Sequence, residues 1–500
     1  MLKYLAKVFS NPPKQQNTEN QGPPPTPLEK DLRTNITQIR NRLRECSDII
    51  YYEFIDPAQN KGLLSYINGF VDSDLLNRDI VTPLLTKTNP DKKNLLYTSL
   101  ISSISTLEEA VNGILEGNVL LIMNEETTAF LLSIRKQVQR SIEEPDSESV
   151  VRGSKEGFVE SVKTNIILLR KRIKSPNLKI QTLKIGRITQ TEVAVVYIDG
   201  IVDPDVLKEV RRRLNKINTD SILETGYIEQ YIQDRKYSPY PTIGITEKPD
   251  VVAGKILEGR VAIFCDGTPH VLTVPLLYIE NLQTSEDYYV RTLNASFLRL
   301  LRLLGLIIST LLPGLYVALS TYHQEMIPTV LLISIAGARE GVPLPALAEA
   351  LLMGIMFELL KESGTRLPRA IGSAISIVGA LVIGEAAVDA GLVSAPLVIV
   401  TATTAVASFI IPPFTETMTI FRLLFTFLGG IMGLIGITCG IFLVMVYTVS
   451  LRSFGVPYTA PLSPGSVNNL KDTFLRFPLS SMKNRPPILA GKNTKRRGGK

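Results

Sequence analysis

Residues 423–451 read LLFTFLGGIMGLIGITCGIFLVMVYTVSL and contain no Asp, Glu, Lys or Arg. A run of about 18 or more apolar residues is long enough to cross the hydrocarbon core of a bilayer as a helix. Two further stretches without charged residues, 303–322 and 390–415, lie upstream. Together the three stretches predict an integral membrane protein and argue against a soluble enzyme.

From residue 297 to residue 452 we expect a helical membrane domain of five to six spans. Four segments are apolar and long enough to span a bilayer, and two weaker segments intervene: 300–322, 371–390, 392–412 and 423–451, with 326–338 and 342–360 as the weaker pair. The segment 342–360 contains two prolines together with Glu349 and Glu358. A broken, polar segment at membrane depth is tolerated where it is buried in protein or lines an aqueous cavity. The alternative is an amphipathic helix at the membrane surface.

Charge is unevenly divided along the 500 residues, which carry a net charge of +7. Residues 451–500 alone hold ten basic residues and one acidic residue. We interpret residues 453–500 as a basic C-terminal tail held near anionic lipid headgroups, in preference to a nucleic-acid-binding segment. Positive charge favours the cytosol both for the loop 361–369 and for the tail. With a cytosolic N-terminal region, six spans place the tail in the cytosol and the loop outside, whereas five spans with a re-entrant 342–360 do the reverse.

For the first 296 residues we expect an α/β region of two subdomains. We place this region in the cytosol, because MLKYLAKVFS at the N-terminus lacks the apolar stretch of a signal peptide. Residues 1–27 are rich in proline and polar residues, which predicts a disordered leader. A first subdomain, an acidic linker and a second subdomain follow, at residues 28–140, 141–149 and 150–292.

Local patterns predict the elements of these subdomains. In the first subdomain we expect helices at 28–46, 72–85 and 96–115 and strands at 48–55 and 118–123. In the second, EVAVVYID (192–199) alternates like a half-buried strand. Asp203 and Pro204 then mark the start of a helix, as N-cap and first helical residue. Residues 261–274 predict a hairpin that turns through Asp266 and Gly267.

Three cysteines lie far apart, with no CxxC spacing, and only two histidines accompany them: Cys46, Cys265, Cys439, His270 and His323. This pattern predicts neither a disulfide framework nor a metal site. HExxH, GxSxG and P-loop patterns are missing from the sequence. We therefore expect no catalytic residue, no metal and no cofactor.

The segment 371–390 carries small residues at intervals of four, a stripe that permits close helix approach. The small residues that could serve helix packing or line a pore are Gly372, Ser376, Gly379, Ala380 and Gly384. Glu385 and Asp389 follow, also four apart, and in an oligomer they would form a ring that attracts cations. The alternative is that both carboxylates lie among headgroups. Our hypothesis is that this helix lines a pore.

Two other segments carry regular patterns. Thr401, Thr404 and Ser408 form a hydroxyl stripe, for which helix packing is favoured over a hydrated path. Two GxxxG patterns in the last segment predict helix association, through Gly429, Gly433, Gly436 and Gly440. For Glu416 and Arg422 we favour ion-pair or capping roles over contact with a transported molecule.

Several long blocks resemble the A subunit of GerA-type spore germinant receptors, in the expected order between residues 48 and 452. They are RGSKEGFVESVKTNIILLRKRI (152–173), TEKPDVVAGKILEGRVAIFCDGTPHVLTVP (246–275), EDYY (286–289) and REGVPLPALAEALLMGIMFELLKESGTRLPRAIGSAISIVGALVIGEAAVDAGLVSAPLVIV (339–400). Members of the family often have Gln where Glu385 stands and Arg where Lys361 and Lys248 stand. The first difference argues against an essential carboxylate at 385.

The resemblance implies residence in the inner membrane of bacterial endospores, with a cytosolic N-terminal region. It also implies two partners, a transporter-like B subunit thought to hold the nutrient and a lipoprotein C subunit. The expected function is that of a homo-oligomeric, nutrient-gated ion channel that triggers germination. The alternatives are an accessory ion channel like the related stage V sporulation protein AF, a secondary transporter, and a membrane scaffold or sensor that conducts nothing.

Overall fold

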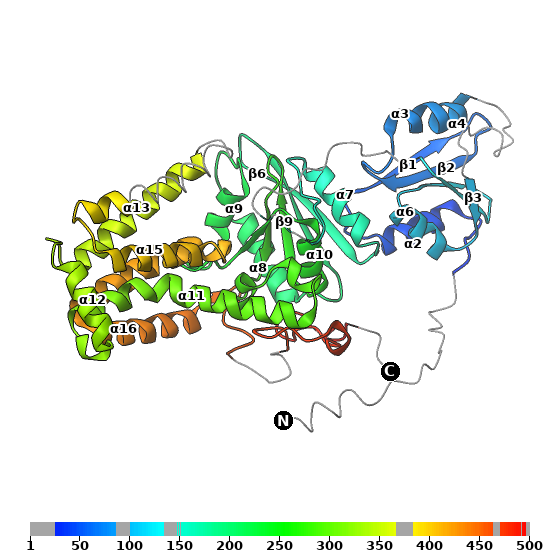
Figure 1. The fold of residues 1–500 in the computed structure, drawn as a ribbon. Coiled ribbons are helices and arrows are strands. Elements are labelled where there is room, and N and C mark those ends of the chain that lie inside the picture. The colour runs from blue at the N-terminus through cyan, green and yellow to red at the C-terminus, as the bar shows by residue number, and fades with distance from the viewer. Residues whose placement is uncertain are drawn as a thin grey trace, which may run out of the picture. The chain divides into compact units, whose positions relative to one another are not determined.

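Figure 1 shows the fold of the chain as a computed structural model, which describes residues 26–86, 101–134, 148, 150, 152–366, 384–463, 471–491 and 493–496. Two compact units make up the chain: residues 1–44 with 48–137, and residues 45–47 with 138–500. The predicted leader as far as residue 25 and most of the predicted linker lie outside the described residues.

The first unit is built on a five-stranded antiparallel sheet of order β1-β2-β4-β5-β3. Its strands are β1 (Ile49–Ile55), β2 (Lys61–Ile67), β3 (Ile101–Ile104), β4 (Val119–Met123) and β5 (Ala129–Leu132). The helices among its described residues are α2 (Leu32–Arg42), α3 (Ser73–Leu76), α4 (Thr82–Thr86) and α6 (Leu107–Leu115), and a short π-helix at Asn77–Val81 joins α3 to α4. The helices cover both faces of the sheet (Figure 1).

One prediction in this unit is wrong at its start. We expected a helix over 96–115, but residues Ile101–Ile104 form strand β3 and the helix begins only at Leu107. Thr106 caps α6 by accepting a hydrogen bond from the Glu109 backbone N–H. Because Thr and Ser favour cap and extended positions over helix interiors, the chain before Thr106 pairs with β5 instead.

The second unit begins with another five-stranded antiparallel sheet, of order β6-β7-β9-β10-β8. The strands are β6 (Leu178–Ile185), β7 (Thr191–Ile198), β8 (Gly244–Thr246), β9 (Val261–Cys265) and β10 (Val271–Val274). Four helices accompany them: α7 (Val162–Arg172), α8 (Pro204–Asn215), α9 (Thr225–Ile232) and α10 (Pro249–Leu257). The predicted strand at 192–199 and the predicted hairpin at 261–274 are confirmed.

Strand β7 shows why this sheet needs cover on both faces. Val193, Val195 and Tyr197 are buried in one core cluster, and Ala194 and Val196 are buried in another on the opposite face. The second of these clusters includes residues of α7 and α10, and the first includes residues of α8 and α9. The predicted start of α8 is confirmed, because Asp203 accepts from the Asp205 N–H and Pro204 is its first residue.

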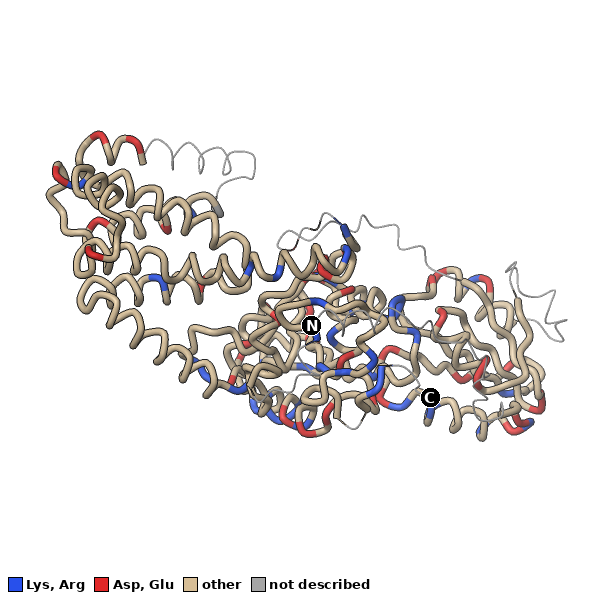
Figure 2. Tube along the Cα trace, turned by 60° about the horizontal axis from the view of Figure 1, so that its bottom comes forward, with Lys and Arg blue, Asp and Glu red and all other residues tan. Residues whose placement is uncertain are grey.

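The helical part of the second unit begins at α11 (Thr292–Thr321). It continues with α12 (Thr329–Arg339), α13 (Ala346–Arg366), α15 (Ala395–Ser408) and α16 (Thr415–Ser450). Charged residues are dense along the α/β part and sparse along these helices (Figure 2). By length and composition, two described stretches could cross a membrane, Thr292–Thr321 and Pro412–Ser450.

Helix α16 is not one straight span, which corrects the expectation for residues 423–451. Gly433 interrupts it with φ 61° and ψ −144°, a conformation outside the helical region. The ring of Tyr240 lies 5.2 Å from that of Phe421 and 6.4 Å from that of Tyr447. A straight helix would separate these two partners by about 39 Å. Residues 415–432 and 434–450 are therefore two antiparallel arms of a helical hairpin.

The hairpin defines two ends of the bundle: a near end beside the α/β part, where Tyr240 lies, and a far end at Gly433. Helix α11 runs from the near end to the far end, where the Tyr322 hydroxyl donates to the backbone oxygen of Gly430 at 3.0 Å. Helix α15 runs in the opposite direction, because its last turn at Ala407 lies against Gly305, in the near half of α11. Helix α13 also approaches the near end, since Phe357 packs on Phe409, just beyond α15.

The break at Gly433 generates a prediction for stability. In Gly433→Ala, an alanine would have to adopt the positive φ that glycine tolerates here. Its Cβ would also lie 2.8 Å from the His323 ring and 3.0 Å from Tyr322. We expect the substitution to cost about 1 to 3 kcal/mol, measured as a lower midpoint of thermal unfolding in detergent.

The matched control is Gly337→Ala in α12, where no atom lies within 4 Å of the new Cβ. Alanine is the better helix former by about 1 kcal/mol, so the midpoint of this control should stay unchanged or rise. Equal melting of the wild type and Gly433→Ala would contradict the expected strain at Gly433.

Candidate functional site in the helical bundle

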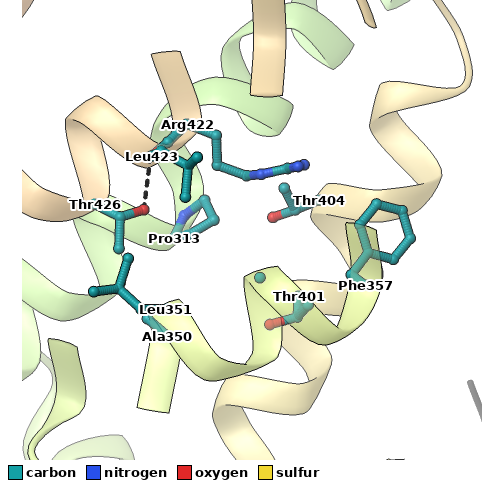
Figure 3. A pocket seen from close by; sticks show the side chains of 10 residues that line it. Pro313, Ala350, Leu351, Phe357, Thr401, Thr404, Arg422, Leu423 and Thr426 are labelled. Carbon is teal, nitrogen blue, oxygen red and sulfur yellow. Dashed lines mark hydrogen bonds between the residues drawn. The ribbon is translucent and has the colours of Figure 1, made fainter. Parts of the chain in front are cut away.

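A small cavity lies between α11, α13, α15 and α16 (Figure 3). Its volume is about 20 Å³, enough for about one water molecule. Thr401 and Thr404 of α15, Arg422 and Thr426 of α16, and Pro313 of α11 are among the residues that line it. The cavity therefore brings hydroxyls and one guanidinium together between four helices.

Arg422 supplies the positive charge at this cavity and is only 6% exposed. One of its Nη atoms donates to Glu358 of α13, and its guanidinium lies 5.7 Å from the centre of the Phe357 ring. Glu358 also lies 2.8 Å from the Nζ of Lys361 and accepts from the Thr419 hydroxyl at 3.1 Å. A buried ion pair that loses one partner leaves an uncompensated charge. This pair therefore ties α13 to the first arm of α16.

Glu349 occupies a separate polar cluster, which includes residues toward the far end of α11. It is fully buried and accepts from the Ser394 backbone N–H at 3.1 Å and from the Ser394 hydroxyl at 2.9 Å. Arg339 of α12 lies 3.4 Å from the second carboxylate oxygen, and the Tyr316 hydroxyl lies 3.4 Å from Ser394 Oγ. Glu349 and Glu358 thus have different partners and do not face one common path.

The hydroxyl stripe of α15 divides by its hydrogen bonds. Thr404 donates to the backbone oxygen of Val400 at 2.7 Å, and Ser408 donates to that of Ala405 at 2.7 Å. Both side chains are buried. Thr401 shares the cavity lining with Thr404.

The pore helix proposed from the sequence is described only at its end. Glu385 and Asp389 are exposed, and Gly384 lies 3.4 Å, measured from an added Cβ, from Val398 of α15. Gly372, Ser376, Gly379 and Ala380 lie outside the described residues.

The glycines of α16 lie where backbones approach closely. A Cβ at Gly429 would meet the backbone oxygen of Gly314 in α11 at 2.4 Å. Gly436 and Gly440 of the second arm face Leu428 in the first arm, at 2.5 and 2.7 Å from an added Cβ. Small residues allow such contact between helix backbones. Gly429 therefore serves the contact between α11 and α16, and Gly436 and Gly440 serve the contact between the two arms of the hairpin.

A second polar centre joins α11 to the end of the α/β part. Asp287 is fully buried and accepts from Arg299 at 2.9 Å and from Arg302 at 2.9 Å. Arg299 also lies 2.9 Å from Asp472 in the C-terminal tail. Burial alone would raise the pKa of Asp287, but the hydrogen bonds and charges of Arg302 and Arg299 outweigh burial and lower it.

Aromatic rings form the rest of this junction. Tyr240 and Tyr278 of the α/β part pack on Phe414, at ring-centre distances of 6.0 and 5.3 Å. Tyr458, after the last helix, lies 6.0 Å from each of these tyrosines. The near end of the bundle is therefore continuous with the core of the α/β part.

Sequence reasoning missed the Asp287 cluster. Its signals were present, since Asp287 stands within EDYY, and Arg299 and Arg302 are three residues apart at the start of an apolar run. Residues three apart share one helix face, so both guanidinium groups can reach one carboxylate. Cys46, Cys265 and Cys439 form no disulfide among the described residues, and Cys46 and Cys265 are buried whereas Cys439 is exposed.

Comparison with known proteins places the chain in a family. The model of the Bacillus/Clostridium GerA spore germination protein family matches residues 37–488, so the chain belongs to that family. Spore germination protein KA of Bacillus subtilis (strain 168) is 42% identical over 95% of this chain and 89% of its own length. The membrane protein YfkQ of the same organism is 42% identical over 92% of this chain and 91% of its own length.

A solved structure also matches. It is the crystal structure of the N-terminal domain of the A subunit of the Bacillus megaterium spore germinant receptor GerK3. It is 34% identical, with a TM-score of 0.40, and the match covers 51% of this chain and 98% of that chain. The family membership confirms the resemblance drawn from the sequence blocks and gives this chain a role in spore germination.

The Asp287 cluster generates a prediction for stability and its pH dependence. Asp287→Asn would leave Arg299 and Arg302 without their shared carboxylate, and we expect a loss of about 3 to 5 kcal/mol at neutral pH. Because the pKa of Asp287 is lowered in the folded chain, its contribution is present above the unfolded pKa. The stability gap between wild type and variant should therefore persist down to about pH 4 and shrink below it.

The control is Asp220→Asn, which removes a carboxylate paired with Arg187 at 2.7 Å on the surface. Exposed pairs contribute at most about 1 kcal/mol. Unfolding curves across pH measure both variants. A loss for Asp287→Asn no larger than that for Asp220→Asn would contradict a structural role for the cluster.

Proposed function

We propose that the chain is the A subunit of a nutrient germinant receptor in the spore inner membrane, where it oligomerises as a nutrient-gated ion channel that triggers germination. The observation that carries this proposal is the Arg422–Glu358 pair beside a hydroxyl-lined cavity, inside the helices of a germination-family chain. Ionisable groups within membrane helices are expensive unless they serve ion pathways or pair with one another. The partners we expect are a transporter-like B subunit, a lipoprotein C subunit and membrane lipid.

We further propose six traverses of the bilayer, with the N-terminal region and the tail on the cytosolic side. Helices α11, α13 and α15 and the two arms of α16 supply five of them. Both α13 and α15 run toward the near end, and the segment 371–390, which the sequence predicts as a span, supplies the sixth traverse. This arrangement puts Lys361 and Arg366, in the last turns of α13, on the same side as the tail, as the charge rule favours. If residues 423–451 formed a single last span, the tail and these basic residues would lie on opposite sides of the membrane. The hairpin adds one traverse and places them on the same side.

The mechanism we propose is a shift between two packings of the bundle. A nutrient-bound partner can favour the open packing only by the difference between its affinities for the two states. The Arg422–Glu358 pair stabilises the closed packing, because it ties α13 to α16 across the cavity. Opening separates these helices, and water then compensates the two charges.

Two alternatives remain distinguishable from this proposal. An accessory channel like stage V sporulation protein AF would conduct without a nutrient-binding partner. A scaffold or sensor would bind partners through its α/β part and conduct nothing. Ion release from liposomes holding the purified assembly separates these cases, and the mass of the detergent-solubilised assembly tests for a closed ring.

The first prediction concerns the ion pair. Glu358→Gln removes the carboxylate that compensates Arg422 and should weaken the closed packing, and about 1.4 kcal/mol would raise the open population tenfold. We expect ion release without nutrient to rise by about that factor in liposomes that also contain the partner subunits.

Glu416→Gln is the control, because this carboxylate is exposed at the start of α16 and has no ion pair among the described residues. Its release should match that of the wild type. Unchanged release by Glu358→Gln, with assembly intact, would remove the ion pair from the gate. Conduction by neither wild type nor variant would favour the scaffold.

The second prediction tests the pore helix expected at 371–390. Replacing Ser376 or Ala380 with Leu adds bulk to the small-residue stripe and should alter spontaneous or nutrient-evoked ion release several-fold. If release and assembly were both unchanged across such replacements, another helix would line the path.

A further inference from the structure

A larger cavity lies on the α/β side of the second unit, against the C-terminal segment 471–496. Its volume is about 400 Å³, within the range of small-molecule sites. Leu277, Ile279 and Met482 give it an apolar wall, and the rest of the lining is mostly polar or charged. The cavity is separate from the one in the helical bundle, and neither the family nor the ion pathway assigns it a ligand.

The acidic groups that line this cavity are already compensated. Arg260 is 4% exposed and lies 2.8 Å from Glu258 and 2.8 Å from Glu280. Asp472 lies 2.9 Å from Arg299. A ligand therefore meets few uncompensated negative charges here.

Basic groups, by contrast, are in excess. Five basic and three acidic side chains line the cavity. Lys471 and Lys483 are exposed at it and have no ion pair among the described residues. Arg485 donates to backbone oxygens of Leu257, Asn493 and Lys495 and to the side-chain oxygen of Asn493, but to no described carboxylate.

Two guanidinium groups, those of Arg485 and Arg496, line the same cavity. Arg496 pairs with Glu258 at the same cavity. Burial lowers the pKa of Arg485, and the positive charge of Arg496 lowers it further. Arg485 thus brings to the cavity a positive charge that donates to no described carboxylate.

We propose that this cavity binds the phosphate group of a phosphoester. Guanidinium groups bind phosphate oxygens in pairs, and lysines add charge at the rim. The volume leaves room beside the phosphate for an organic body, which the apolar wall contacts. The same chemistry occurs in anionic phospholipid headgroups and in soluble phosphoesters, and basic pockets on the cytosolic side of membrane proteins bind headgroups. The proposal does not depend on ion conduction.

The test uses the full chain in nanodiscs of phosphatidylcholine, with inorganic phosphate as the probe in equilibrium dialysis. We expect saturable binding by the wild type. Lys471→Gln combined with Lys483→Gln removes two rim charges without breaking any hydrogen bond or ion pair described for them, and it should weaken binding about tenfold. Arg485→Gln should weaken binding as much, with the thermal unfolding midpoint as a check that the tail stays docked.

Lys216→Gln combined with Lys236→Gln is the matched control, because it removes two exposed lysines that do not line the cavity. Its phosphate affinity should equal that of the wild type. Equal weakening by both lysine pairs, or no saturable binding by the wild type, would overturn the proposal.

A second experiment distinguishes the two sources of the phosphate group. In nanodiscs of phosphatidylglycerol, a headgroup ligand would compete with inorganic phosphate, and native mass spectrometry would find lipid retained by the wild type and lost from the Lys471/Lys483 variant. Equal phosphate binding in both lipids would identify a soluble phosphoester as the ligand.

Discussion

A single buried carboxylate joins the two halves of the second unit. Asp287 lies at the end of the α/β part and receives Arg299 and Arg302 from the first turns of α11. Removing a charge from water costs several kcal/mol per ion, and only close partners offset that cost. Because the two arginines are three residues apart, their bonds to one acceptor fix both the position and the rotation of α11. The helices that pack on α11 take their places from it.

The contacts along α11 show how this constraint extends to the candidate site. Gly314 admits the backbone of α16 at Gly429, so the two helices touch without intervening side chains. That approach lies beside the cavity, where Pro313 of α11 and Arg422 and Thr426 of α16 are neighbours. At the near end, the tyrosines of the α/β part pack on Phe414 and Phe421. The α/β part is therefore in direct side-chain contact with the start of α16.

The division into an α/β region and a helical region was predictable from the sequence. Long apolar runs without charged residues occur only after residue 300, and charged and apolar residues are mixed before it. The strand at 192–199 and the capped start of α8 were predictable for the same local reasons. The reversal at Gly433 was not, since GxxxG patterns describe straight packed helices and sharp breaks alike. Strand β3 was missed because a four-residue strand is specified by its partner β5 rather than by its own pattern.

For the candidate site, the sequence identified the polar residues but not their partners. Glu349 and Glu358 stood out as carboxylates in an apolar segment, yet Ser394 and Arg422, which bind them, lie 45 and 64 positions further along the chain. Such pairings follow from tertiary packing, and no local pattern specifies them. Asp287 was hidden for the same reason, since its arginines belong to a different element.

The distribution of thiols has a practical consequence. Cys439 is exposed on the second arm of α16, whereas Cys46 and Cys265 are buried, and burial raises the pKa of Cys265 to about 12. A sulfhydryl reagent that enters the bilayer can therefore reach the thiol of the second arm, whereas the two buried thiols are shielded from it. Cys439 could therefore carry a spectroscopic label that reports on the surroundings of the second arm, without any substitution in the chain.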